Sequence, residues 1–167
     1  KEFISRPHWR ELVFALPTTN PEIDPFNLEL TTTTSYYIQA MKKEKSLCDL
    51  TPITAVGLVL TSDNKFIYGV RSGVEGILNI VPGGYVSGNI KSLNPIFSAF
   101  YSELEEETGI GPQNISTTKM IGYQTDPHHN AFCFIFGAKT IFTSHDLMKM
   151  HLDALSTYHS SKKSGKS

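Results

Sequence analysis

The sequence is poor in several features that would quickly assign it to a class of protein. Its 167 residues include two cysteines and one tryptophan, and its formal net charge is −1. Cys48 and Cys133 stand in no Cys-x-x-Cys or Cys/His spacing, which argues against a zinc site and leaves open two free thiols or one long-range disulfide. The balanced charge provides no basic excess for nucleic acid, so we expect nucleic acid to be an unfavoured partner.

Long apolar runs are also lacking. No stretch approaches the roughly 18 apolar residues that a membrane-spanning helix needs. The first ten residues have no apolar core of a signal peptide, and the chain starts at Lys1 without an initiator Met, so its completeness stays open. We therefore expect a cytoplasmic protein that makes no use of a membrane.

The texture of the chain changes near residue 50. Before it, a stretch rich in proline and threonine predicts extended segments and turns, with one short helix over 35–45. We interpret residues 1–50 as an N-terminal extension or small appendage. Residues 51–159 are expected to form the main domain, and the polar residues 160–167 a disordered tail.

The main domain contains segments of both regular types. Five segments rich in Val, Ile, Leu or Phe predict strands: 53–61, 66–70, 77–81, 118–125 and 131–142. The first two are joined by a short polar turn and are expected to form a hairpin. Two consecutive glycines, Gly83 and Gly84, follow the third strand and predict a turn at which the backbone can approach another group closely.

Two helices are predicted. The first covers 92–109, with Asn94 as N-cap, Pro95 at the first helical position and Gly109 at the C-terminal end. Its apolar arc, which should face the core, consists of Phe97, Phe100, Tyr101 and Leu104. The second covers 144–159, with Ser144 as the expected cap.

The first helix carries an unusual concentration of acid. Glu103, Glu106 and Glu107 share one face, whereas Glu105 points elsewhere, and residues 76–102 contain no acid at all. No Lys or Arg stands one turn away to offset the repulsion. Two explanations stay open on spacing alone: a solvated helix end, or a site for a hard divalent ion such as Mg²⁺, which prefers oxygen ligands.

Together, "PGG" at 82–84 and "ELEEETGI" at 103–110 resemble the Nudix box, G-x5-E-x7-R-E-U-x-E-E-x-G-U, where U is a bulky aliphatic residue. The resemblance implies an α/β protein, a Nudix-type α/β/α sandwich with a mixed β-sheet. It also implies divalent-metal-dependent hydrolysis of a nucleoside diphosphate linked to another moiety, with Mg²⁺ or Mn²⁺ as cofactor. Carried over by position, Glu103, Glu106, Glu107 and Gly84 are the implied metal-binding residues, and Glu103 is also a candidate catalytic base.

The sequence departs from the box at two positions. Ser102 stands where the pattern has the arginine that orients the catalytic glutamate. The upstream glutamate is missing, because the loop after the glycine turn is four residues longer than the pattern and offers Ile90 or Asn94 instead. We expect an active, divergent pyrophosphohydrolase. The alternative is a catalytically degenerate Nudix-like domain that binds a nucleotide or a partner protein.

Candidates outside the box lie in two loops. Asp126 is the second candidate for the base, since family members commonly take an additional acid from beyond the box. His128 and His129 follow it in the same loop, and Arg71 ends the second strand; these three are candidates for binding the substrate phosphates. A surface turn and a structural salt bridge are their alternative roles. The expected partner is a small nucleoside diphosphate derivative of unspecified identity, and a homodimer stays open.

Overall fold

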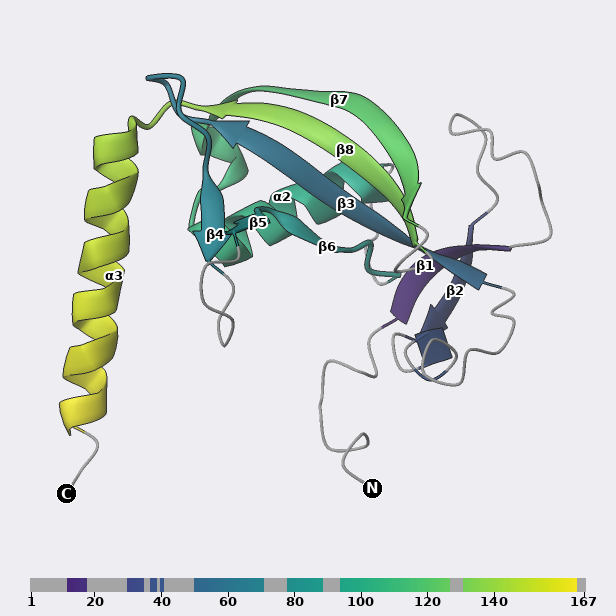
Figure 1. The fold of residues 1–167 in the computed structure, drawn as a ribbon. Coiled ribbons are helices and arrows are strands. Elements are labelled where there is room, and N and C mark those ends of the chain that lie inside the picture. The colour runs from purple at the N-terminus through teal and green to yellow at the C-terminus, as the bar shows by residue number, and fades with distance from the viewer. Residues whose placement is uncertain are drawn as a thin grey trace.

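The structure, a computed structural model, describes residues 12–17, 30–34, 37–38, 40, 50–70, 78–88, 94–126 and 131–164. Its strands are β1 (Leu12–Pro17), β2 (Thr31–Thr34), β3 (Leu50–Leu60), β4 (Tyr68–Val70), β5 (Leu78–Ile80), β6 (Gly83–Tyr85), β7 (Ile115–Asp126) and β8 (Ala131–Thr140). Its helices are α2 (Pro95–Thr108), a single 3-10 turn (Pro112–Asn114) and α3 (Ser144–Ser164) (Figure 1).

The larger sheet is mixed. Its strand order is β2-β1-β3-β8-β7, and β6 pairs with β3 beside this path. β3 runs parallel to β8, whereas β1, β6 and β7 run antiparallel to the strands that they pair with. β4 and β5 form a separate two-stranded sheet. The expectation of an α/β protein with a mixed sheet is confirmed.

Helix α2 covers one face of this sheet and supplies much of the core. Phe100 and Leu104 are fully buried, and the Phe100 ring stacks on Phe136 of β8 at a centroid distance of 4.8 Å. A Cβ at Gly57 of β3 would overlap the Phe100 ring, so this glycine allows the helix to approach the sheet closely. The apolar arc predicted for α2 therefore faces the core, as expected.

The predicted ends of α2 are confirmed by their hydrogen bonds. Asn94 is the N-cap, and its Oδ1 accepts from the Phe97 N–H at 3.2 Å. Gly109 closes the helix with a left-handed backbone (φ 72°), and its N–H donates to the Glu105 carbonyl. Local chemistry at both ends thus fixes the residues at which α2 begins and ends.

The hairpin predicted between 53–61 and 66–70 is confirmed only next to its turn. Leu60 and Phe66 form an antiparallel bridge, and the Ile67 N–H donates to the Val59 carbonyl at 3.0 Å. Beyond this point, β4 pairs with β5 instead of β3. The reason is that both edges of β3 are occupied. β8 takes one edge along Ile53–Leu60, and β6 with the Pro82 carbonyl takes the other as far as Gly57. Too little of β3 remains for a second full strand.

The N-terminal segment contributes to the same sheet. β1 pairs with β3 from Ala15↔Pro52 to Pro17↔Leu50, and β2 pairs with β1. Ala15 and Ile38 are buried, with 0% and 1% of their surface exposed. The extended character predicted for residues 1–50 agrees with these strands. The boundary expected at residue 50, however, falls at the first residue of β3.

The N-cap of helix α3 lies one residue earlier than expected. Thr143, not Ser144, is the cap: its Oγ1 accepts from the Asp146 N–H at 3.2 Å, and Asp146 Oδ2 accepts from the Thr143 N–H at 2.9 Å. This is a reciprocal capping box, for which the Asp three residues later was the signal. The helix continues to Ser164, so part of the segment expected to be disordered is helical.

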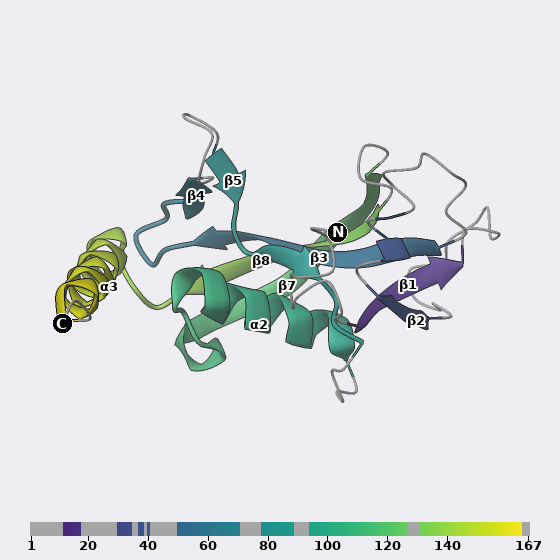
Figure 2. The same cartoon turned by 90° about the horizontal axis from the view of Figure 1, so that it is seen from below.

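Helix α3 stands beside the sheet in both Figure 1 and Figure 2. Leu147 packs against the core, whereas Met148, Met150 and Leu152 farther along are exposed. Within the described part of the chain, no helix has both the length and the apolar character needed to cross a membrane.

Candidate functional site

The glycine turn is fixed to the central strand of the sheet. Gly83 and Gly84 lie in β6 opposite Val56 and Ala55 of β3. Just before them, the Pro82 carbonyl accepts from the Gly57 N–H at 2.9 Å. These backbone contacts hold the turn on the same strand against which Phe100 of α2 packs. The turn and the helix are therefore positioned by one shared support.

Two glutamates of α2 reach this turn. Glu107 Oε2 accepts a hydrogen bond from the Gly83 N–H at 3.1 Å. The Glu103 carboxylate lies so close to Gly84 that a Cβ at this position would overlap it. Because Glu103 and Glu107 are four residues apart, one turn of helix separates them on the same side. The structure thus brings three of the residues singled out in the sequence together: Gly84, Glu103 and Glu107.

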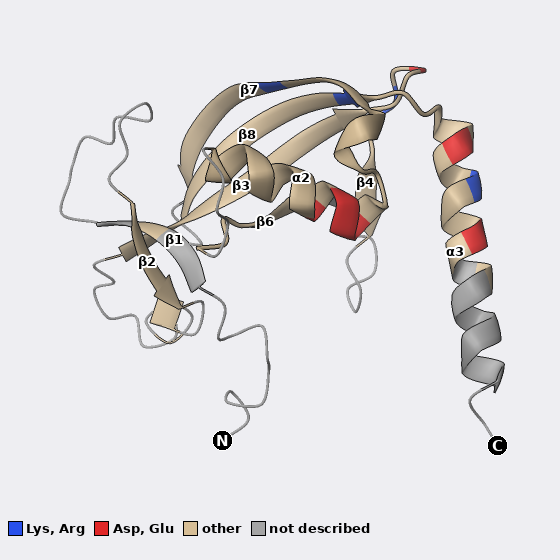
Figure 3. Cartoon of the chain, turned by 180° about the vertical axis from the view of Figure 1, so that it is seen from behind, with Lys and Arg blue, Asp and Glu red and all other residues tan. Residues whose placement is uncertain are grey.

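The other acids of the helix are more remote from the turn. Glu105 and Glu106 are exposed, and the described contacts of the glycines involve neither side chain. Figure 3 shows the acidic residues of α2 gathered at its C-terminal end, near β4. Across the described residues, no set of three or more His, Cys, Asp or Glu is arranged to hold a metal ion. The convergence consequently involves two carboxylates, not the three expected from the helical face.

The environment of Glu107 favours its protonated form. Partial desolvation of the carboxylate raises the pKa of Glu107, and the nearby charge of Glu106 acts in the same direction. The hydrogen bond from Gly83 opposes this shift in part. The residue as a whole remains exposed, so the desolvation concerns the carboxylate end, which faces the turn. A cation bound here would offset both causes of the raised pKa.

The two departures from the box have structural counterparts. Ser102 is exposed on α2 next to Glu103. Asn94, which spacing offered for the missing upstream glutamate, uses its amide oxygen to cap the helix. It also lies nine residues before Glu103, or roughly 13 Å along the helix axis. Asn94 is thus committed to the other end of α2 and does not substitute for the missing acid.

The described part of the structure places none of the remaining candidates at the glycine turn. Arg71, His128 and His129 lie outside the described part of the chain. The backbone of Asp126 ends β7 opposite Ala131, while its side chain is not described. β7 is separated from β6 by β8 and β3, so the backbone of Asp126 is at least three strand spacings, roughly 14 Å, from Gly84.

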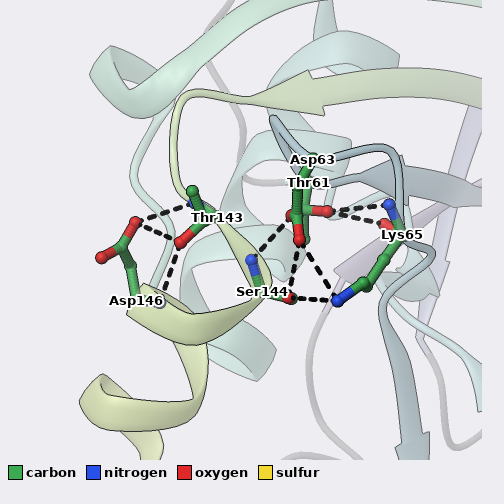
Figure 4. Close-up of polar contacts among 6 residues, drawn as sticks. All are labelled: Thr61, Asp63, Lys65, Thr143, Ser144 and Asp146. Atoms are coloured by element: carbon green, nitrogen blue, oxygen red, sulfur yellow. Dashed lines mark hydrogen bonds and ion pairs between the residues drawn. The ribbon is translucent and has the colours of Figure 1, made fainter.

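A second polar cluster, which the sequence reasoning did not single out, holds the start of α3 (Figure 4). Asp63, in the turn after β3, accepts from the backbone N–H and the hydroxyl of Ser144, both at 2.8 Å. Lys65 donates to Ser144 Oγ at 3.0 Å and lies 3.3 Å from Asp63. Hydrogen bonds from Thr61 and Ser144 hold the pKa of Asp63 well below its usual range.

These contacts are those of a helix anchor. Asp63 and Ser144 are 81 positions apart in the chain, so the sequence could not indicate their contact. It showed only the polar turn "SDNK" and the capping pattern "TSHD". Known proteins provide no further assignment for either cluster: no protein-family model matches the chain, and no curated protein matches it.

Proposed function

We propose that this chain is a Nudix-type pyrophosphohydrolase, which uses Mg²⁺ or Mn²⁺ to hydrolyse a nucleoside diphosphate linked to another moiety. The observation that carries the proposal is the convergence of Glu103 and Glu107 on the Gly83–Gly84 turn. In a solvated acidic helix end, the carboxylates would extend into water, and no close contact between a carboxylate and a glycine would be expected. A metal site built from carboxylates and backbone carbonyls does need such an approach.

The residues present fit a magnesium ion. Mg²⁺ is commonly bound by one or two carboxylates, with waters and substrate phosphates completing its coordination. Glu103 and Glu107 supply the carboxylates in this proposal, the Gly84 carbonyl is a further oxygen ligand, and Glu106 adds charge from the neighbouring position.

The reaction is the attack of water on one phosphorus of the pyrophosphate. A bound divalent ion neutralises the phosphate charge and lowers the pKa of water in such a site. Glu103 takes the proton from the attacking water in our proposal. One P–O bond forms to the water oxygen and the bridging P–O bond breaks, which yields two phosphate products. Glu107 is held in place by the Gly83 N–H and balances charge at the turn.

The Nudix-type α/β/α sandwich and a cytoplasmic location belong to the same proposal. The order of strand, glycine turn and helix along the chain supports the fold, and α2 forms one of its helical layers. The second helical layer has no counterpart in the described residues, since Leu147 of α3 packs against the core but Met148, Met150 and Leu152 are exposed. Glu103 is the base in this proposal, because the backbone of Asp126, the second candidate, lies three strands away from Gly84. Arg71, His128 and His129 keep their proposed roles as phosphate contacts.

A binding module without hydrolysis is the second candidate function. Two observations favour it: Ser102 replaces the arginine of the box, and Asn94 is engaged in capping. Such a module would bind the nucleotide or a partner protein, and its binding would not depend on a divalent ion.

One experiment separates the two functions. Purified protein is tested with a panel of nucleoside diphosphate derivatives in Mg²⁺ or Mn²⁺, beside Glu107→Gln and the control Glu105→Gln. Glu105 lies on the same helix, and its side chain contacts neither glycine of the turn in the described structure. We expect the wild type to turn over at least one compound. Glu107→Gln should reduce this turnover at least about 100-fold, which is the scale of losing one major charge-stabilising group. Glu105→Gln should retain it. Metal-independent binding without turnover of any compound would establish the binding module instead.

A further inference from the structure

The two-stranded sheet β4–β5, called the ribbon below, carries a continuous apolar face. In its register Tyr68 lies opposite Ile80, and Val70 lies opposite Leu78. Directly opposed residues of an antiparallel pair point to the same side, so these four side chains share one face. Phe66 extends the face, because its ring lies 6.2 Å from that of Tyr68.

This apolar face is exposed in the single chain. The exposed fractions are 53% for Phe66, 49% for Tyr68, 74% for Val70, 63% for Leu78 and 51% for Ile80. The opposite face is covered: Ile67 packs against the core, and a Cβ at Gly69 would contact the Val81 side chain. Both faces of the ribbon are thus apolar, as in strands that are covered on both sides. Among the described residues, however, only one face is covered.

The ribbon is also poorly supported on its own. Two-stranded sheets are marginally stable in water unless a face packs on something else. In Figure 2 the ribbon projects from the larger sheet, to which its covered face is attached through Ile67. Its segments, 66–70 and 78–80, contain no charged residue, although exposed strands normally carry charge to prevent association. A surface with these properties fits a protein interface better than it fits water.

We infer that the apolar face of the ribbon binds a second copy of this chain, face to face about a twofold axis. Two properties favour a copy of the chain over a foreign partner. An isologous dimer brings the same patch of both subunits into contact, so the patch must be compatible with itself. The face has no charge, so no like charges meet when it packs on itself. Its extent also suffices, as the area shows.

The area can be compared with that of stable dimers. Five half-exposed to three-quarters-exposed apolar side chains present roughly 100 Å² each, or about 500 Å² in all. Such a patch lies at the upper end of what monomeric proteins expose. Two copies would bury about 1,000 Å² together, which reaches the lower limit of a specific interface. The ribbon alone can therefore form the centre of a dimer.

The variants Val70→Glu and Leu78→Glu test this interface. Both side chains are largely exposed in the single chain, so the substitutions should leave the fold intact, which circular dichroism would check. Ile121→Glu is the matched control, because Ile121 is also aliphatic, in a strand and 57% exposed, but lies on β7.

The measurement is molar mass by light scattering over a concentration series. We expect a dimer for the wild type and for Ile121→Glu, and its loss in both ribbon variants. Mixing Val70→Glu with Val70→Lys should restore a mixed dimer through opposite charges. A wild type that stays monomeric at every concentration would overturn the inference. Another occupant, such as α3 or a foreign protein, would then have to cover the ribbon. A dimer that persists in both ribbon variants would overturn it equally. Neither result depends on turnover, so the proposed hydrolase is judged separately.

Discussion

Gly84 is the residue whose lack of a side chain matters most for the candidate site. The Glu103 carboxylate occupies the space in which a Cβ would stand. We expect Gly84→Ala to displace Glu103 and to weaken the effect of Mg²⁺ on stability. At a Mg²⁺ concentration 100 times its Kd, binding adds about 2.7 kcal/mol to the wild type, which is roughly a 5–10 °C rise in Tm. In Gly84→Ala this rise should be largely lost.

Gly122→Ala is the control for this substitution. A Cβ at Gly122 in β7 would have no neighbour within 4 Å, so the variant should keep both its Tm and its response to Mg²⁺. Calorimetry or a dye-based melting curve, with and without chelator, measures the two quantities. Equal responses to Mg²⁺ in Gly84→Ala and the wild type would contradict a metal site at this turn.

The raised pKa of Glu107 predicts a stability effect in the metal-free protein. A carboxyl group with a higher pKa in the folded state favours folding while it is protonated, and this contribution is lost as the pH rises through the folded-state pKa. Glu107→Gln removes the charge but keeps an oxygen acceptor for Gly83. In chelator at pH 7, we expect a higher Tm for Glu107→Gln than for the wild type. The difference should shrink as the pH falls through the raised folded-state pKa, and it should be lost once the pH is below the ordinary value of 4.5.

Glu105→Gln sets the background for this comparison, because it removes one negative charge from the same helix. A metal-free Glu107→Gln that melts below the wild type at pH 7 would show that the carboxylate is not disfavoured there. With Mg²⁺ the order should reverse, since the wild type alone gains the full stabilisation by the ion.

How much of the site was visible in the sequence depends on the range of each interaction. Helical spacing alone places Glu103 and Glu107 on one side of α2, and two glycines indicate a close approach. The sequence could not indicate that Glu106 would stay exposed, because this depends on the angle at which α2 packs on β3. Nor could it indicate that Asn94 would cap the helix with its amide oxygen, since a cap and a ligand use the same atom.

At the scale of elements, α3 depends on the contacts at its start. Thr143 and Asp146 satisfy backbone N–H groups of the first turn reciprocally. Thr143→Ala removes the hydroxyl acceptor and should destabilise this end by about 1 kcal/mol. We expect roughly fivefold faster hydrogen exchange in the first turn of α3, with the amides of β8 unchanged. Thr143→Ser keeps the hydroxyl and should exchange like the wild type.

The same end of α3 should resist acid. Hydrogen bonds from Thr143 lower the pKa of Asp146, and those from Thr61 and Ser144 lower the pKa of Asp63. A carboxylate with a depressed pKa stabilises the fold above the unfolded-state value, and this contribution is lost as the pH falls through the folded-state pKa. Protection of the first turn of α3 should therefore persist as the pH is lowered past 3.8, the ordinary value.

Asp63→Asn is the control for the acid titration, because it keeps an oxygen acceptor but cannot titrate. NMR signals of the Ser144 amide, followed downward from pH 5, measure the effect. A wild-type signal that titrates at or above pH 3.8 would contradict the anchoring role of Asp63.

Element boundaries illustrate which parts of the fold are local. The ends of α2 were predictable because Asn94 and Gly109 act on their own neighbours in the chain. The partner of β4 was not, because pairing depends on which edges of β3 are already taken by β6 and β8. The parallel pairing of β3 with β8 joins residues about 80 positions apart, and no short-range pattern encodes it.

At the scale of the whole molecule, the N-terminal strands extend the same sheet as the candidate site. β1 continues the hydrogen bonding of β3 at Thr51 and Pro52, next to the segment that pairs with β6 and the glycine turn. An appendage that folds separately would not pair one of its strands with a strand of the main domain, as β1 does with β3. We therefore expect β1 and β2 to stabilise the strand on which the glycine turn rests.

Ile38→Ala tests this coupling. Ile38 is 1% exposed, and truncating a buried isoleucine destabilises a protein by about 2–5 kcal/mol. For a chain of this size that corresponds to roughly 4–20 °C in Tm. If the chain unfolds as one cooperative unit, calorimetry should show a single transition that moves to lower temperature as a whole, as it should for Phe100→Ala in the core of α2. Thr32→Ala, at an exposed position of β2, should leave the transition in place. Two transitions, of which only one responds to Ile38→Ala, would mean that the N-terminal strands fold independently, and the support of the glycine turn would then rest on β6 and α2 alone.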